Sequence, residues 1–137
     1  MKRQALIIKS SADGKRNIAV DVANYRVIIG FISRDQRHQN KFKDICNIIL
    51  NNLRNPDLYD KEDINEKCKN VTAMKFFKGQ ENARIYCQEI RRKGIDFVIV
   101  ASELLERKKN KKNRQKEINI IEKVAGYEYE IQSSEED

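Results

Sequence analysis

The sequence predicts an α+β fold, in which an antiparallel or mixed sheet carries an N-terminal-side helical hairpin and a C-terminal helix. Two observations lead to this prediction. Apolar, β-branched runs bounded by turn residues outnumber the segments with helical periodicity. Most junctions between these runs are short, which suits antiparallel pairing. Such an order favours one sheet with its helices packed on one face.

The first 33 residues predict three strands. Residues 5–9 and 17–22 flank the turn signal Asp13-Gly14, so we expect a β-hairpin over about residues 4–22. Residues 25–33 form a further apolar and β-branched run, which predicts a third strand.

Two helices are expected next. Ser33 is predicted to cap the first helix, with Gln36 as its capping-box partner. Asn55-Pro56 should end this helix, because the residue before a proline is disfavoured in the helical conformation. Residues 60–69 predict a second, shorter helix that packs antiparallel against the first. The face of the first helix that repeats at three and four residues consists of Phe42, Ile45, Cys46, Ile49 and Leu53.

The second half of the chain predicts a three-stranded meander over residues 71–77, 83–90 and 94–101, and residues 102–106 could extend its last strand. A final helix is expected over residues 113–125, closed by Gly126. Its inward side chains are predicted to be Ile118, Ile121, Val124 and Ala125. We therefore expect a single domain over residues 1–131 and a disordered acidic tail over residues 132–137.

The charge of the chain favours acidic partners. The 137 residues carry a formal net charge of +7 and a pI near 9.3. The charge is also uneven: residues 107–116 hold seven cations and no acid. A local asymmetry of this kind indicates an interaction segment more strongly than the total does.

The three cysteines and one histidine do not suggest a metal or redox site. Cys46, Cys68 and Cys87 form no CxxC pair, so we expect three reduced, buried thiols and neither metal nor cofactor. His38 lies in a polar segment and is predicted to be at the surface. The sequence has no signal-peptide pattern and no apolar run near 18 residues, so a cytoplasmic protein without a membrane partner is expected.

The predicted order of elements resembles that of the RelE/HigB-type toxins of bacterial toxin–antitoxin systems, and the phage-derived HigB-like branch most of all. These toxins have a strand, a helical hairpin, a three-stranded meander and a C-terminal helix. The resemblance covers about residues 25–131, and the N-terminal hairpin is an addition to it. The motifs that carry it are Met74-Lys75-Phe76-Phe77-Lys78, Ala83-Arg84-Ile85-Tyr86, Phe97-Val98-Ile99-Val100-Ala101, Arg107-Lys108-Lys109 and Tyr127-Glu128-Tyr129.

The resemblance implies an mRNA interferase, which is a toxin that cleaves mRNA, usually at the ribosome, and so inhibits translation. It also implies a cognate antitoxin that covers the basic face. The oligomer expected is either a toxin–antitoxin hetero-oligomer or a homodimer. Some members of the superfamily poison DNA gyrase instead, and others are inactive. A nonenzymatic module that binds nucleic acid or protein, and a gyrase inhibitor, therefore stay open as alternatives.

Cleavage of RNA by attack of a 2′-hydroxyl needs a base, an acid and positive charge at the phosphate. Clustered lysines and arginines can supply all three, because neighbouring cations lower the pKa of a lysine. We expect Lys75 or Lys78 as the base, Arg84 and Arg107 as phosphate clamps, and Tyr127 or Tyr129 as a stacking or positioning group. The predicted RNA-binding residues are Arg107, Lys108, Lys109, Lys111, Lys112 and Arg114.

Each of these residues also has a simpler interpretation. Lys75 and Lys78 could be solvated charges at a strand edge, and Arg84 could form an ordinary ion pair with a nearby glutamate. The tyrosines could pack on the core. The basic segment of residues 107–116 could be a loop that only keeps the protein soluble.

Overall fold

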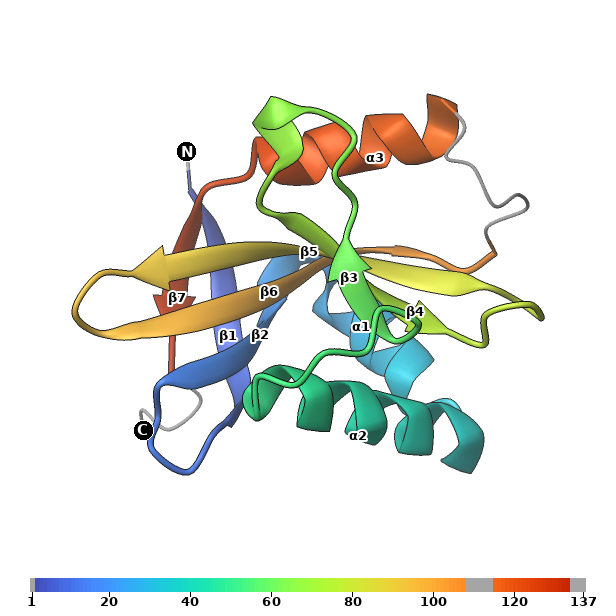
Figure 1. Ribbon diagram of the computed structural model, residues 1–137, viewed down its shortest axis with the longest axis horizontal. Helices are drawn as coiled ribbons and strands as arrows, with labels where there is room; N and C mark the ends of the chain where they lie inside the picture. The colour runs from blue at the N-terminus through green and yellow to red at the C-terminus, as the bar shows by residue number, and fades with distance from the viewer. Residues whose placement is uncertain (1, 108–114, 134–137) are drawn as a thin grey trace.

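A mixed seven-stranded sheet forms the centre of the structure, with α3 on one face and α1 and α2 on the other (Figure 1). This computed structural model describes residues 2–107 and 115–133. The order of strands across the sheet is β3-β4-β5-β6-β2-β1-β7. The predicted α+β class with a mixed sheet is confirmed, whereas the expectation that all helices share one face is wrong.

The bounds of the elements follow the chain. The strands are β1 (Arg3–Ser10), β2 (Arg16–Asp21), β3 (Tyr59–Lys61), β4 (Val71–Phe76), β5 (Ala83–Arg92), β6 (Asp96–Leu105) and β7 (Tyr129–Gln132). The helices are α1 (Tyr25–Ile32), α2 (Gln36–Leu50) and α3 (Gln115–Ala125), with short 3₁₀ turns at Val22–Asn24 and Glu66–Cys68.

The predicted N-terminal hairpin is confirmed. β1 and β2 pair antiparallel, with Ala5 opposite Asp21. Gly14 in the connecting turn has a φ of 74°, which glycine adopts without steric cost. β2 then runs parallel to β6, with Arg16 opposite Phe97, so the hairpin continues the sheet rather than projecting from it.

Residues 25–33 form α1 and not the predicted strand. Ile28, Phe31 and Ile32 are buried at helical spacing, whereas Val27 is 59% exposed on the other side. The β-branched content of the run favoured a strand, but a short apolar run is compatible with either structure. Packing against the sheet favours the helix, because the helix places Ile28, Phe31 and Ile32 in the core beneath the sheet.

α2 confirms the predicted helix but not its ends. Asp35 rather than Ser33 caps it, and its carboxylate accepts a hydrogen bond from the backbone N–H of His38. The helix ends at Leu50, ahead of the predicted stop at Asn55-Pro56. Leu53, expected on the buried face, is 52% exposed.

The predicted helix over residues 60–69 is wrong. Tyr59–Lys61 is instead β3, which pairs with β4, and only a single 3₁₀ turn follows at Glu66–Cys68. Asp63 has a φ of 50°, which a continuous helix does not allow. The helical pair before the meander is therefore formed by α1 and α2.

The predicted meander of β4, β5 and β6 is confirmed. Each strand pairs antiparallel with the next, and β6 continues to Leu105 as the extension anticipated. The turn between β5 and β6 contains Gly94 with a φ of 77°. A bulge shifts the register between Tyr86 and Cys87.

The C-terminal segment adds a strand that was not predicted. Ile121 and Val124 of α3 are buried as expected, while Ile118 and Ala125 are partly buried. β7 then pairs parallel with β1, with Arg3 opposite Tyr129. The predicted start of the disordered tail is wrong, because Gln132 is the last residue of β7. Residues 134–137, most of the predicted tail, lie outside the described residues.

The three cysteines are free and buried, as predicted. His38, in contrast, is only 3% exposed, so its predicted surface position is wrong. Its ring packs edge-on against Phe31 and Phe77, at centroid distances of 4.9 and 4.8 Å. The polar neighbours of His38 in the sequence suggested the surface, but His38 lies four and seven residues before Phe42 and Ile45, on the buried face of α2.

Candidate nucleic-acid interface

Lys75 of β4 and Arg84 of β5 are direct cross-strand partners. Partners in an antiparallel ladder project from the same face of the sheet, so the two cations are neighbours on the face that α3 covers. The next pair along this face joins Ala73 and Tyr86, which pack in the core cluster beneath α3. The backbone pairing therefore brings together two of the residues that the sequence singled out.

Arg84 is unusually buried for an arginine. It is 8% exposed, and its Nε and Nη1 atoms are buried without a hydrogen-bond partner among the described residues. Tyr86, two residues further along β5, is fully buried, and its hydroxyl also has no hydrogen-bond partner among the described residues. Burying unsatisfied donors costs free energy, and a bound anion that accepts from them would remove that cost.

Lys75 is half-buried, and its pKa lies below the usual 10.5. Burial is the largest cause, followed by the positive charge of Arg84, and Asp60 and Glu62 oppose the shift in part. The Nζ of Lys75 donates a hydrogen bond to the carbonyl of Pro56 at 2.8 Å. A lysine with a lowered pKa releases its proton more readily and so serves better as a base.

Lys78 lines the same cleft as Lys75, despite the odd spacing that would separate them on a regular strand. β4 ends at Phe76, and Phe77 has a φ of 58°, which breaks the alternation of the strand. The cleft has a volume of about 330 Å³ and also contains Asp57, whose carboxylate pairs with the Nζ of Lys78 at 2.8 Å. We call Lys75, Lys78 and Arg84 the Lys75–Arg84 corner.

Arg107 is exposed, two residues beyond Leu105, which lies opposite Arg84 in the register of β5 and β6. The remaining predicted RNA-binding residues lie outside the described residues; they are Lys108, Lys109, Lys111, Lys112 and Arg114. Their predicted role stays a prediction.

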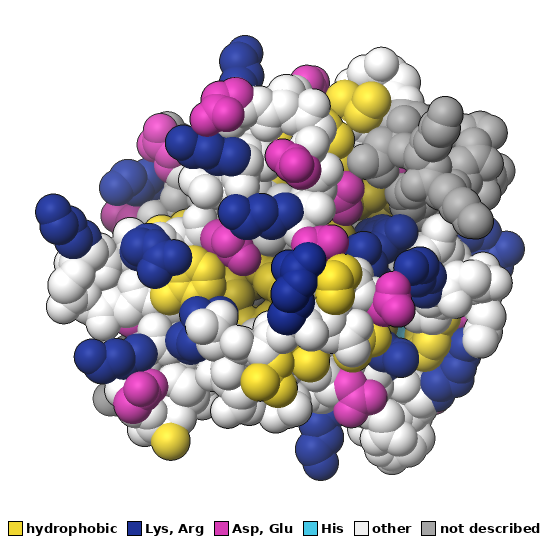
Figure 2. Space-filling view, viewed as in Figure 1, with side chains coloured by type: hydrophobic (Ala, Val, Ile, Leu, Met, Phe, Trp, Pro, Cys, Tyr) yellow, Lys and Arg dark blue, Asp and Glu magenta, His cyan; other side chains and the backbone are white. Residues whose placement is uncertain are grey.

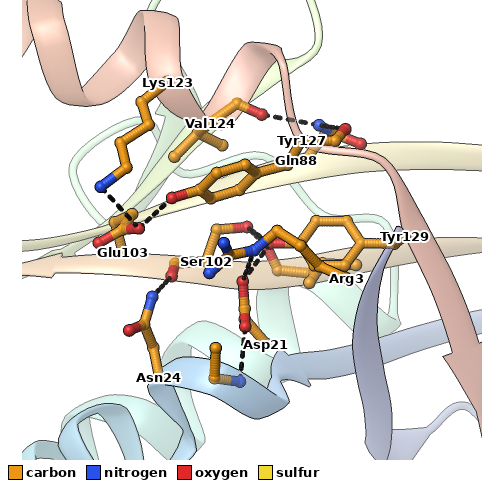
Figure 3. A network of polar contacts seen from close by, with 12 residues as sticks. Arg3, Asp21, Asn24, Gln88, Ser102, Glu103, Lys123, Val124, Tyr127 and Tyr129 are labelled. Atoms are coloured by element: carbon orange, nitrogen blue, oxygen red, sulfur yellow. Dashed lines mark hydrogen bonds and ion pairs between the residues drawn. The ribbon is translucent and has the colours of Figure 1, made fainter. Parts of the chain in front are cut away.

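Tyr127 and Tyr129 belong to a polar network that spans β6, β2, β1 and β7 (Figure 3). The Tyr127 hydroxyl donates to the carboxylate of Glu103, which also lies 3.8 Å from the Nζ of Lys123. The Tyr129 hydroxyl lies 2.7 Å from the carboxylate of Asp21 and 2.8 Å from Ser102 Oγ.

Asp21 is the centre of this network. It is fully buried and also accepts from Arg3 Nε at 2.7 Å. The guanidinium of Arg3 lies 3.9 Å from the centre of the Tyr127 ring. The network joins β1, β2, β6 and β7, so its geometry explains how β7 is held, and the catalytic role expected of the two tyrosines stays a prediction.

Within residues 2–107 and 115–133, no group of three or more histidine, cysteine, aspartate and glutamate side chains is arranged to hold a metal ion. Within the same ranges, none of the helices has the length and apolar character needed to cross a bilayer.

Comparisons with protein-family models, with curated proteins and with solved structures give no match to this chain. The arrangement of the side chains is therefore the basis for inferring a function.

Proposed function

We propose that this protein is a toxin that cleaves RNA, acting on mRNA at the ribosome in the cytoplasm and so inhibiting translation. The observation that carries the proposal is the cross-strand pair of Lys75 and Arg84. It sets an amine with a lowered pKa beside a buried guanidinium that has two unsatisfied nitrogen atoms among the described residues. A base and a fixed positive charge are two of the requirements for cleaving a phosphodiester by 2′-hydroxyl attack.

The order of elements supports a RelE-like interpretation. From β2 onward the chain forms a strand, the helical pair α1 and α2, the meander β4–β6 and the C-terminal helix α3. This is the layout that the resemblance implies, although it begins at β2 and not at residue 25. The strands β1, β3 and β7 make the sheet larger than is typical of these toxins.

In the proposed reaction, neutral Lys75 takes the proton of the 2′-hydroxyl, whose oxygen attacks the adjacent phosphorus. Arg84 binds the nonbridging oxygens of the phosphorane, with Arg107 as a second clamp. The bond to the 5′-oxygen breaks, and the ammonium of Lys78 protonates that oxygen. The products are a 2′,3′-cyclic phosphate and a 5′-hydroxyl.

The partner proposed with this function is a cognate antitoxin. An acidic segment of that partner would neutralise the cations around the Lys75–Arg84 corner and exclude RNA. A toxin–antitoxin hetero-oligomer is the state that this arrangement favours, and a homodimer of the free toxin is compatible with it.

The experiment is a cleavage assay on ribosomes that carry a defined mRNA, with the cut sites mapped by primer extension. We expect Lys75→Gln and Arg84→Gln each to lower the cleavage rate by about 100-fold or more. The matched control is Lys43→Gln, an exposed lysine of α2, which should cleave like the unmodified protein. Because two guanidinium nitrogens of Arg84 are buried without a described hydrogen-bond partner, Arg84→Gln should preserve or raise the melting temperature while it lowers the cleavage rate.

The combination of lost activity and retained stability separates a catalytic role from a structural one. No cleavage by the unmodified protein on programmed ribosomes would refute the proposal. So would full activity in a folded Arg84→Gln variant.

One observation favours a second candidate, a binding module without turnover. Both lysines of the corner already have partners, since Lys75 donates to Pro56 and Lys78 pairs with Asp57. Such a module would bind RNA with an affinity that falls steeply as salt rises, but would leave the RNA intact. The same assay, with binding measured beside cleavage, distinguishes the two functions.

A further inference from the structure

A second cationic surface lies at the opposite end of β5 from the Lys75–Arg84 corner. Two adjoining hollows of about 380 and 490 Å³ share Arg16, Arg91 and Phe97. We call this surface the Phe97 groove. Figure 2 shows this side of the molecule, with Lys and Arg side chains around a hollow that has a hydrophobic floor. In the sequence, residues 91–93 only join two predicted strands, and nothing in the spacing connects them to Arg16.

Two of the arginines that line the groove, Arg16 and Arg91, pack against the same ring. The guanidinium carbons of Arg16 and Arg91 lie 4.7 and 4.8 Å from the centroid of Phe97, which is only 8% exposed. Arg16 Nε also donates to the carbonyl of Ile49 at 2.6 Å. Guanidinium groups fixed in this way lose little conformational entropy when they bind a ligand.

The groove has a strong excess of positive charge. Seven cations and three carboxylates line the two hollows. Two of the carboxylates are already engaged: Glu89 accepts from the Tyr59 hydroxyl at 2.8 Å, and Asp96 accepts from Arg92 at 2.7 Å. Among the described residues, neither Arg16 nor Arg91 forms an ion pair with a carboxylate. The guanidinium groups of Arg16 and Arg91 are therefore available to bind an anionic ligand.

We propose that the Phe97 groove binds single-stranded RNA, with phosphates on its cations and a base against an arginine plane. Fixed guanidiniums suit this ligand, because they donate to phosphates and stack on bases. An acidic protein segment would satisfy the charge but would make no use of the guanidinium planes.

The groove lies on the face of the sheet that α1 and α2 cover, whereas Arg84 projects from the face that α3 covers. The groove adjoins the Lys75–Arg84 corner around the β3 edge of the sheet. Leu58 lines the cleft of Lys75 and Lys78, and the next residue, Tyr59, lines the groove. Arg84 and Arg91 are seven residues apart on β5, about 23 Å at the rise of a strand. The groove would thus hold RNA away from the cleaved bond, so this proposal rests on the proposed function and specifies where its substrate lies.

The test is binding of a labelled single-stranded RNA of about twelve nucleotides, followed by fluorescence anisotropy over a range of salt concentrations. We expect the double variant Arg91→Gln/Lys93→Gln to raise Kd about tenfold and to reduce the salt slope by about 1.4, which is about 0.7 for each lost phosphate contact. Both side chains are exposed, so the variant should fold normally. Lys43→Gln on α2 is the control, which removes one positive charge outside the groove, and it should alter Kd less than twofold.

Unchanged affinity in the double variant would overturn the proposal. An acidic peptide of similar length that binds more tightly than the RNA, and loses its affinity in the double variant, would overturn it in favour of a protein partner. Failure of the proposed function gives a different result: the unmodified protein would not cleave on ribosomes, but groove variants would still weaken RNA binding.

Discussion

The hydroxyl of Tyr129 lies 2.7 Å from the carboxylate of Asp21, although 108 residues separate them in the chain. Asp21 is fully buried in the hairpin, and Tyr129 belongs to the last strand of the sheet. The contact therefore ties the two ends of the described chain to each other.

Asp21→Asn should destabilise the protein by about 3 kcal/mol. The substitution removes a buried carboxylate that accepts from Arg3, Tyr129 and the backbone of Ala23, and hydrogen bonds to charged groups contribute about 1.5–3 kcal/mol each. Urea denaturation measures the change. Tyr129→Phe should cost less, about 1 kcal/mol, and the double variant should cost less than the sum. Strict additivity of the two changes would contradict the direct coupling of this pair.

Stability should decline at alkaline pH because of the same network. Burial is the main cause of the raised pKa of both Tyr127 and Tyr129, and the hydrogen bonds to Glu103 and Asp21 act in the same direction. The unfolded chain therefore releases these protons first, near the usual pKa of 10.0. The stabilising contribution is complete below that pH and is lost as the pH rises above it. Urea unfolding at about pH 8 and about pH 11 tests this, and Tyr129→Phe should show a smaller loss.

The pKa of Lys75 should depend on Arg84. Burial lowers this pKa most, and the charge of Arg84 lowers it further. Arg84→Gln removes the second cause, so the pKa should rise toward, but not reach, 10.5. Carbon-13 NMR of the lysine Cε atoms measures this without any activity assay. If the protein cleaves RNA, the acidic limb of its pH–rate profile should move to higher pH as well. A resonance of Lys75 that titrates identically in both proteins would contradict the electrostatic coupling.

Replacing either of two glycines by alanine should change the stability of the protein, but in opposite directions. Gly94 has a φ of 77°, so Gly94→Ala should destabilise the protein by about 1–2 kcal/mol through backbone strain. Gly30 lies inside α1, and a Cβ atom added there meets no atom within 4 Å. Gly30→Ala should therefore stabilise the protein by about 0.5–1 kcal/mol. Thermal denaturation of the two variants checks both signs, and a loss of stability in Gly30→Ala would show that α1 is not a helix in solution.

Local patterns in the sequence predicted the hairpin, α2, the meander and α3. They failed where a short segment was compatible with more than one structure. Residues 25–33 have strand-like composition, and only the sheet behind Ile28 and Phe31 makes them a helix. Tyr59–Lys61 has no periodicity of its own and becomes a strand because β4 offers an unpaired edge.

The candidate site was predictable only in part, for a similar reason. The pairing of Lys75 with Arg84 follows from two adjacent antiparallel strands, which the sequence did predict. The Phe97 groove depends on β2 lying parallel to β6, which brings Arg16 opposite Phe97. No local pattern encodes that pairing, because 81 residues separate its members.

The position of β7 has a consequence for how the protein is made. Arg3 pairs with Tyr129, so β1 is synthesised more than a hundred residues before the strand that covers its outer edge. Until residue 132 is available, the outer edge of β1 presents unsatisfied backbone groups to other chains in the cell. The nascent chain would then be vulnerable to misassembly through this edge until β7 has been synthesised.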